Sequence, residues 1–75
     1  MPENPITVYT LEGCGKCVVF KKKLKEMGVD YVEKNCTANP GVARVLKLHT
    51  FPSIEVNGEI LAYNSAVAWL REQDL

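Results

Sequence analysis

Apolar and polar residues follow two different periods in the first third of the chain. Residues 6–10 alternate in character and are rich in β-branched types, which predicts a strand over Ile6–Thr10. From residue 14 the apolar positions recur every three or four residues, which predicts an amphipathic helix over Cys14–Met27 that ends at Gly28. The residues expected on its buried face are Cys17, Phe20, Leu24 and Met27.

The remaining chain contains five more segments of regular character, bounded by turn and cap residues. Asn39 is the expected N-cap of a helix with Pro40 at its first position, and Ser65 is the expected cap of the last helix. Asn57-Gly58 is typical of a type I′ hairpin turn. The predicted segments are strands over Val29–Asn35, Ser53–Val56 and Glu59–Ala62, and helices over Pro40–Leu48 and Ala66–Gln73.

The order of these segments is β-α-β-α-β-β-α, which predicts the α/β class. A helix between the first two strands implies a parallel pair with a right-handed crossover, and the last two strands form an antiparallel hairpin. We therefore expect a four-stranded mixed sheet with helices on both faces. The 75 residues are short enough to form a single domain over 1–75 around a shared core.

Composition narrows the range of functions. The formal net charge is zero, which argues against a nucleic-acid or anionic-membrane role, because both require a basic excess. Five lysines nevertheless gather on or near the first helix, which indicates a solvated helix face or, as the alternative, a docking patch for an acidic partner. They are Lys16, Lys21, Lys22, Lys23 and Lys25.

The cysteine count and the first residues point to a reducing compartment. Three cysteines cannot all pair, and this low, odd number is unlike the disulfide framework of a small secreted domain. Residues 1–5 show no basic stretch followed by an apolar run, and no apolar segment approaches transmembrane length. We expect a cytoplasmic, monomeric protein.

Cys14 and Cys17 form a C-x-x-C motif between the first strand and the first helix. A helix N-terminus and a nearby cation, here Lys16, stabilise the thiolate form of a cysteine. Cys17 lies one turn further and faces inward, where it can resolve a mixed disulfide formed at Cys14. This context favours a redox pair over half of a metal site.

One metal-binding alternative remains open from the residues alone. Cys14, Cys17, Cys36 and His49 are together the right types for a structural Cys3His zinc site. Outside such a site, Cys36 is expected to be a small buried residue, and His49 a polar surface residue.

The C-x-x-C after the first strand and Thr50-Phe51-Pro52 before the third resemble the glutaredoxin branch of the thioredoxin superfamily. This resemblance extends from Ile6 to about Arg71. It implies a thioredoxin-type fold, Cys14 as nucleophile and Cys17 as the resolving cysteine. It also implies that Pro52 is cis and faces the pair, so that the Phe51 backbone can pair with an extended substrate. No bound cofactor is implied, and glutathione is the implied co-substrate. Because some glutaredoxins share an iron–sulfur cluster between two chains, an iron–sulfur module is a further alternative that the resemblance raises.

The chain departs from the usual glutaredoxin pattern at three places. Leu11 stands where a Lys or Arg is usual, Gly15-Lys16 replaces Pro-Tyr, and residues 62–65 read Ala-Tyr-Asn-Ser instead of Gly-Gly, a polar residue and Asp. Lys16 can replace part of the missing charge, and Ser65 with the last helix's amides can hold a carboxylate. NrdH-type redoxins, a similar branch, take their electrons from thioredoxin reductase.

The sequence therefore predicts a dithiol–disulfide oxidoreductase that reduces protein disulfides or glutathione mixed disulfides. The predicted catalytic residues are Cys14 and Cys17, with no metal. The predicted substrate-binding residues are Lys16, Phe51, Pro52 and Ser65. The expected partners are a disulfide-containing protein and, as reductant, either glutathione or thioredoxin reductase.

Overall fold

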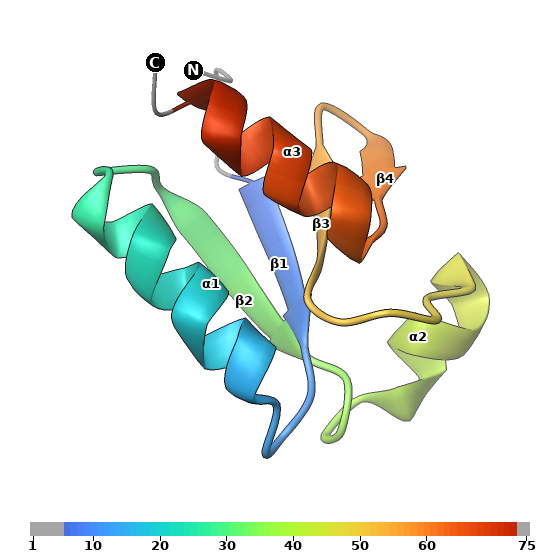
Figure 1. The fold of residues 1–75 in the computed structure, drawn as a ribbon. Helices are drawn as coiled ribbons and strands as arrows, with labels where there is room; N and C mark the ends of the chain where they lie inside the picture. The colour runs from blue at the N-terminus through green and yellow to red at the C-terminus, as the bar shows by residue number, and fades with distance from the viewer. Residues whose placement is uncertain (1–5, 74–75) are drawn as a thin grey trace.

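A four-stranded mixed sheet forms the centre of the molecule in the computed structural model, which describes residues 6–73 (Figure 1). The strand order is β2-β1-β3-β4, with β1 parallel to β2 and antiparallel to β3, and β3 antiparallel to β4. This confirms the predicted topology and the thioredoxin-type fold. The elements are β1 Ile6–Thr10, α1 Gly15–Glu26, β2 Tyr31–Asn35, α2 Pro40–Leu46, β3 Ser53–Val56, β4 Glu59–Leu61 and α3 Tyr63–Gln73.

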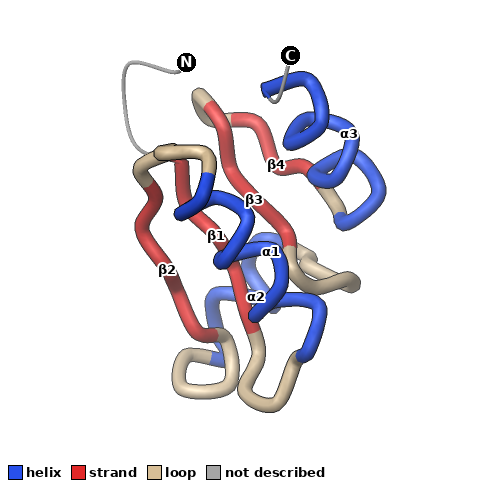
Figure 2. The backbone as a smooth tube through the Cα atoms, turned by 60° about the vertical axis from the view of Figure 1, so that its left-hand side comes forward, coloured by secondary structure: helices blue, strands red, loops and turns tan. Residues whose placement is uncertain are grey.

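The main core lies between the sheet and the two longer helices. α1 and α3 cover the same face of the sheet, as Figure 1 and Figure 2 show from two directions. Alternate residues of β1 point into this layer because successive side chains of a strand point to opposite faces. The buried residues of this core are Ile6, Val8, Phe20, Leu24, Val29, Ile54, Ala66 and Leu70.

A smaller cluster lies on the opposite face and is covered by α2. Tyr9, Cys36 and Leu48 are buried there, and Val42 and Leu46 of α2 pack against them. Tyr9 reaches this face because it alternates with Val8 and Thr10 along β1. The prediction of helices on both faces is therefore confirmed.

The end of α1 agrees with the sequence signals, but β2 begins later than predicted. Gly28 has a φ of +71° and donates to the Lys25 carbonyl, while the Val29 N–H donates to the Leu24 carbonyl at 3.0 Å. These two bonds close the helix in a Schellman arrangement. Val29 is therefore part of the helix ending rather than of the strand, and β2 begins at Tyr31.

Both later helices differ from prediction at one end. α2 stops at Leu46 rather than Leu48 because Lys47 is left-handed, with φ 56° and ψ 46°. This turn directs Leu48 into the smaller cluster. Asn39 precedes α2 as expected, but its side chain makes no capping hydrogen bond.

The predicted cap at Ser65 is wrong. α3 begins at Tyr63, and its first turn is closed by a 2.7 Å bond from the Ala66 N–H to the Ala62 carbonyl. The Thr50 hydroxyl accepts a hydrogen bond from the Tyr63 N–H at 3.0 Å. Thr50, a residue of an earlier loop, thus caps the start of α3. Ser65 lies exposed within the first turn.

The β3–β4 hairpin and the loop before it follow the sequence signals. Asn57 and Gly58 both have positive φ, 51° and 84°, as a type I′ turn requires. β4 ends at Leu61, one residue earlier than predicted. The Phe51–Pro52 peptide bond is cis, as the family resemblance implied. Within residues 6–73, no helix combines the length and apolar character needed to cross a bilayer.

Candidate active site

Cys14 occupies the N-cap of α1 and is partly exposed. Its backbone is extended, with φ −84° and ψ 105°, and its Sγ accepts a hydrogen bond from the Cys17 N–H at 3.1 Å. Its carbonyl accepts from the Val18 N–H at 3.2 Å, which begins the helix. The sulfur thus takes the role that a Ser or Asp oxygen has at other helix starts. An amide donor and the positive end of the helix both face it.

Cys17 is only 2% exposed and lies on the sheet side of α1. Burial, followed by its hydrogen bond with Cys14, raises the pKa of the Cys17 thiol to about 11. A hydrogen bond with the Leu11 backbone and the charge of Lys21 act in the opposite direction but do not outweigh burial. Cys17 is therefore a protonated thiol at neutral pH.

Lys16 joins the start of α1 to the start of α3. Its Nζ lies 4.8 Å from the centroid of the Tyr63 ring, within the range of a cation–π contact. Tyr63 stands at one of the positions where the family pattern has glycine. Residues 16 and 63 belong to separate elements with no shared periodicity, so no local sequence pattern predicts this contact.

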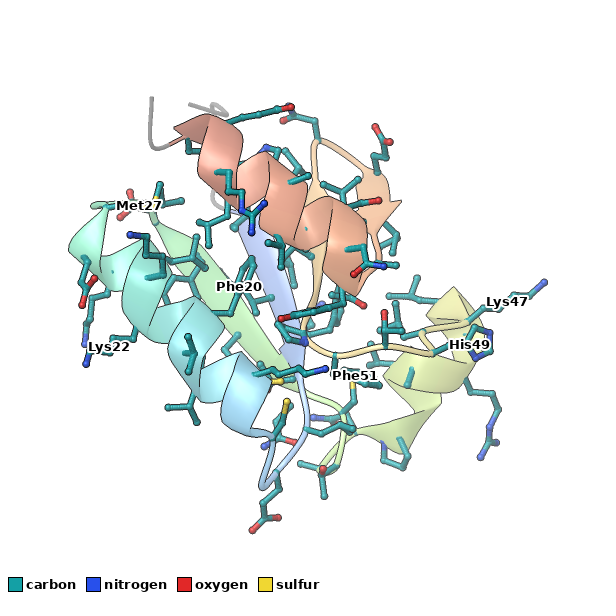
Figure 3. The ribbon with its side chains drawn as sticks, viewed as in Figure 1. Phe20, Lys22, Met27, Lys47, His49 and Phe51 are labelled. Atoms are coloured by element: carbon teal, nitrogen blue, oxygen red, sulfur yellow. The ribbon has the colours of Figure 1, made fainter. Side chains whose placement is uncertain are left out.

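The Phe51–Pro52 segment enters β3 beside the end of β1. Ser53 pairs with Tyr9 across the sheet, so Pro52 lies at the edge from which the cysteine loop leaves β1. Pro52 is fully buried, and half-buried Phe51 packs against the Tyr9 cluster. Figure 3 shows Phe51 in the stretch between the cysteine end of α1 and α2. The Ser53 hydroxyl donates to the Thr50 carbonyl and helps to fix the loop.

Ser65 and Lys16, both predicted to bind substrate, line different hollows of the structure. Ser65 lines a hollow between α3 and the β3–β4 hairpin, together with Trp69. Lys16 and Tyr63 line another hollow, between α1 and α3. Leu11, which replaces the usual cation of the family, is 38% exposed just before the cysteine loop.

A polar network beside the pair was missed at the sequence level. The Thr10 side chain is 1% exposed, and its hydroxyl donates to Glu33 at 2.8 Å. Lys21 forms an ion pair with the same carboxylate at 3.0 Å. The hydrogen bonds from Thr10 and then from Lys21 lower the pKa of Glu33. Only the β1–β2 register and the packing of α1 on the sheet bring these residues together, because they come from β1, α1 and β2.

The four residues of the possible zinc site are not gathered. Cys36 lies in the cluster on the α2 face, whereas Cys17 faces the sheet from α1. His49 lies at the far end of α2, away from the start of α1 (Figure 3). In the described part of the chain, no three His, Cys, Asp or Glu side chains are placed to share a metal ion. The Cys3His alternative therefore has no geometric support.

The comparisons with known proteins agree with this geometry. Among solved structures, the thioredoxin-like protein BC3987 is 26% identical, with a TM-score of 0.70, over 91% of this chain and 97% of that one. Wheat glutaredoxin is 18% identical, with a TM-score of 0.65, over 93% of this chain and 73% of that one. A search among curated proteins gave no match. The glutaredoxin family model matches residues 6–61, from β1 to the end of β4. Since this match spans most of the sequence and includes the cysteine pair, the chain belongs to the glutaredoxin family.

Proposed function

We propose that the protein is a dithiol–disulfide oxidoreductase in which Cys14 is the nucleophile and Cys17 the resolving cysteine. The observation that carries this proposal is the unequal placement of two adjacent thiols. Cys14 is partly exposed at the positive end of α1, while Cys17 is buried behind it. The 3.1 Å hydrogen bond from the Cys17 N–H to the Cys14 Sγ holds the Cys14 sulfur close to Cys17, as exchange between the two sulfurs requires.

The reaction takes place in two exchanges. The Cys14 thiolate attacks one sulfur of the substrate disulfide, and the other sulfur leaves as a thiolate. Cys17 then gives up its proton and attacks the Cys14 sulfur, which releases the second substrate thiol. The proton from Cys17 balances the charge on a departing thiolate. The substrate gains two electrons, and the protein is left with a Cys14–Cys17 disulfide that an external thiol reduces.

The loop at Phe51 and Pro52 provides the surface on which the substrate lies. A buried Pro52 at the end of β1 leaves the Phe51 backbone groups available for an extended peptide, as at the edge of a sheet. The substrates are protein disulfides or glutathione mixed disulfides. A thiol cycle of this kind needs a reducing compartment, and the cytoplasm is the proposed one.

The electron donor is either glutathione or a thioredoxin reductase. Glutathione is the donor that the family suggests, with Lys16 near one of its carboxylates. The Lys16–Tyr63 contact and the exposed Leu11 favour the second candidate, because both change positions that hold glutathione in the family. A redoxin of the NrdH type would use the reductase directly.

Cysteine variants test the two roles. Cys14→Ser should lose all thiol–disulfide exchange, because no other exposed thiol lies at a helix start in the described residues. Cys17→Ser should accumulate a mixed disulfide on Cys14, which mass spectrometry of the intact protein detects. Full protein-disulfide reductase turnover by Cys17→Ser would refute the two-cysteine mechanism.

A parallel assay identifies the donor. Turnover is measured with glutathione, glutathione reductase and NADPH, and separately with thioredoxin reductase and NADPH. If glutathione is the donor, we expect weak saturation that Leu11→Lys improves. Rapid turnover in the second assay alone would establish the reductase as donor.

A further inference from the structure

An apolar groove runs between α1 and α3 and begins beside the redox pair. Its volume is about 540 Å³, within the range of small-ligand and peptide side-chain sites. Gly15 and Lys16, the two residues after Cys14, form its start. In Figure 3, Phe20 lies in the space between α1 and the strands below α3. The full lining is Gly15, Lys16, Val19, Phe20, Lys23, Tyr63, Val67 and Leu70.

The lining combines apolar side chains with positive charge. Val19 lines the groove and is 67% exposed, so this apolar side chain is open to solvent there. The two charged residues of the lining, Lys16 and Lys23, are both basic, and none of the lining residues is acidic. Because the chain has a formal net charge of zero, this positive charge is local to the groove and to α1. Such a surface complements a ligand that is both apolar and acidic.

We propose that this groove binds a segment of the protein substrate in which acidic and apolar residues are interspersed, close in that chain to the disulfide attacked by Cys14. The inference rests on the proposed function, because the groove begins at the residue that follows the nucleophile. Apolar side chains of the segment lie over Val19, Val67 and Leu70. Its carboxylates lie beside Lys16 and Lys23 at the rim.

A protein segment fits the groove better than glutathione does. Apart from Lys16 and Lys23 the lining offers mainly apolar side chains, and glutathione has little apolar surface with which to cover them. The groove extends along α1 from Lys16 to Lys23, two turns of helix, which suits several residues of an extended chain. Substrate selection therefore occurs beside the pair and does not alter the chemistry of the two thiols.

Single-turnover reduction of synthetic peptides tests the proposal without an external reductant. Two peptides carry the same internal disulfide and differ in the following segment, which alternates leucine with aspartate in one and leucine with lysine in the other. Reduced protein should react with the acidic peptide at a half-saturating concentration about tenfold lower. The maximal rates should agree within about twofold. Equal half-saturation for the two peptides would overturn the proposal.

Variants of the groove locate the effect. Val19→Asp and Lys23→Glu should each raise half-saturation for the acidic peptide about three- to tenfold, because an exposed charge contact contributes a few-fold in affinity. The matched controls are Val45→Asp on α2, where Val45 is 78% exposed, and Lys22→Glu, which points away from α3 (Figure 3). Both control variants should change the half-saturating concentration of the acidic peptide by less than about twofold. Equal effects of groove and control variants would refute the groove.

Two further measurements distinguish failure of docking from failure of the redox function. Hydroxyethyl disulfide, a small uncharged substrate, should react equally with the wild type and with Val19→Asp. A cysteine-free peptide bearing the acidic segment should bind the wild type in a fluorescence anisotropy assay and bind Val19→Asp about tenfold more weakly. Binding without any disulfide reduction would refute the proposed function and leave the groove in place. Reduction of hydroxyethyl disulfide without peptide binding would refute the groove alone.

Discussion

Cys14 and Cys17 are three residues apart, yet burial makes them chemically different. Cys14 lies at the N-cap and is partly exposed, whereas Cys17 is one turn further, is buried and faces the sheet. Removing a thiol from water disfavours its charged form, which is the main reason that the pKa of Cys17 rises to about 11. The helical period thus places two identical side chains in different surroundings.

Alkylation of the reduced protein should reveal this difference. At pH 7.5, iodoacetamide should modify Cys14 first, since the thiolate is the reacting form. The rate at Cys17 should rise about tenfold for each pH unit and level off near pH 11. Peptide mass spectrometry assigns each label, and the unfolded chain in denaturant serves as control. Equal rates at pH 7.5 in the native protein would contradict this account.

Glu33 links a buried hydroxyl to a lysine. Its pKa is lowered by the hydrogen bonds from Thr10 and Lys21, so the unfolded chain binds more protons than the folded one near the ordinary value of 4.5. The contribution of Glu33 to the free energy of unfolding is therefore complete above pH 4.5. It is lost as pH falls through the lower pKa that Glu33 has in the folded state. The carboxylate is partly exposed, so its ion pair contributes at most about 1 kcal/mol.

Two substitutions at this position separate the ion pair from the hydrogen bond. Glu33→Gln should lower the free energy of unfolding at pH 7 by less than about 1 kcal/mol, because the amide oxygen still accepts from Thr10. Glu33→Val should cost about 1–3 kcal/mol, because the buried Thr10 hydroxyl loses its partner. Urea unfolding at pH 7 and pH 3 measures both. A Glu33→Gln deficit that persists unchanged at pH 3 would contradict the charge argument.

At the scale of the elements, the ends of helices depend on contacts from elsewhere in the chain. α3 begins at Tyr63 because the Thr50 hydroxyl, 13 residues earlier, accepts from its N–H. Ser65 resembles a cap in sequence but lies inside the first turn. The same hydrogen bond ties the Pro52 loop to α3, so this loop and the groove between α1 and α3 share a support.

Substitution of Thr50 should destabilise the protein more than substitution of Ser65. Thr50→Val removes the acceptor at the start of α3 and should lower the free energy of unfolding by about 0.5–2 kcal/mol. Thr50→Ser keeps the hydroxyl and is the matched control, while Ser65→Ala should be nearly neutral. Urea denaturation of the three variants checks this order. A larger loss for Ser65→Ala than for Thr50→Val would show that the cap is Ser65 after all.

At the scale of the whole molecule, the sheet lies between the third cysteine and the Cys14–Cys17 pair. Cys36 packs with Tyr9 and Leu48 under α2, and burial raises the pKa of its thiol. The C-x-x-C pair belongs to α1, which covers the other face. The fold therefore allows the Cys14–Cys17 disulfide to form without exchange into Cys36.

The oxidised protein should accordingly retain one free thiol for each chain. We expect titration in denaturant after mild oxidation to give one thiol, and peptide mapping to place it at Cys36. Cys36→Ala should keep the rate of disulfide exchange while losing some stability through the small cavity it creates. Absence of a free thiol, or a disulfide that includes Cys36, would show that the sheet does not isolate it.

Local periodicity by itself determined the strands, the main helices and the redox pair. Side-chain alternation in residues 6–10 and the helical period from Cys14 to Met27 are properties of neighbouring residues, and they place two cysteines at a strand–helix junction. The long crossover and the Asn57-Gly58 turn then determined the strand directions. These signals were enough for a four-stranded mixed sheet with helices on both faces and for the positions of Cys14 and Cys17, and the family resemblance added the thioredoxin-type fold.

Only the tertiary structure decided what surrounds the pair. The Thr50 cap of α3, the Lys16–Tyr63 contact and the Thr10–Glu33–Lys21 network each join residues at least 12 positions apart. The groove between α1 and α3 likewise needs both helices on one face of the sheet. Such contacts depend on how whole elements pack, and no periodic pattern within one element encodes them.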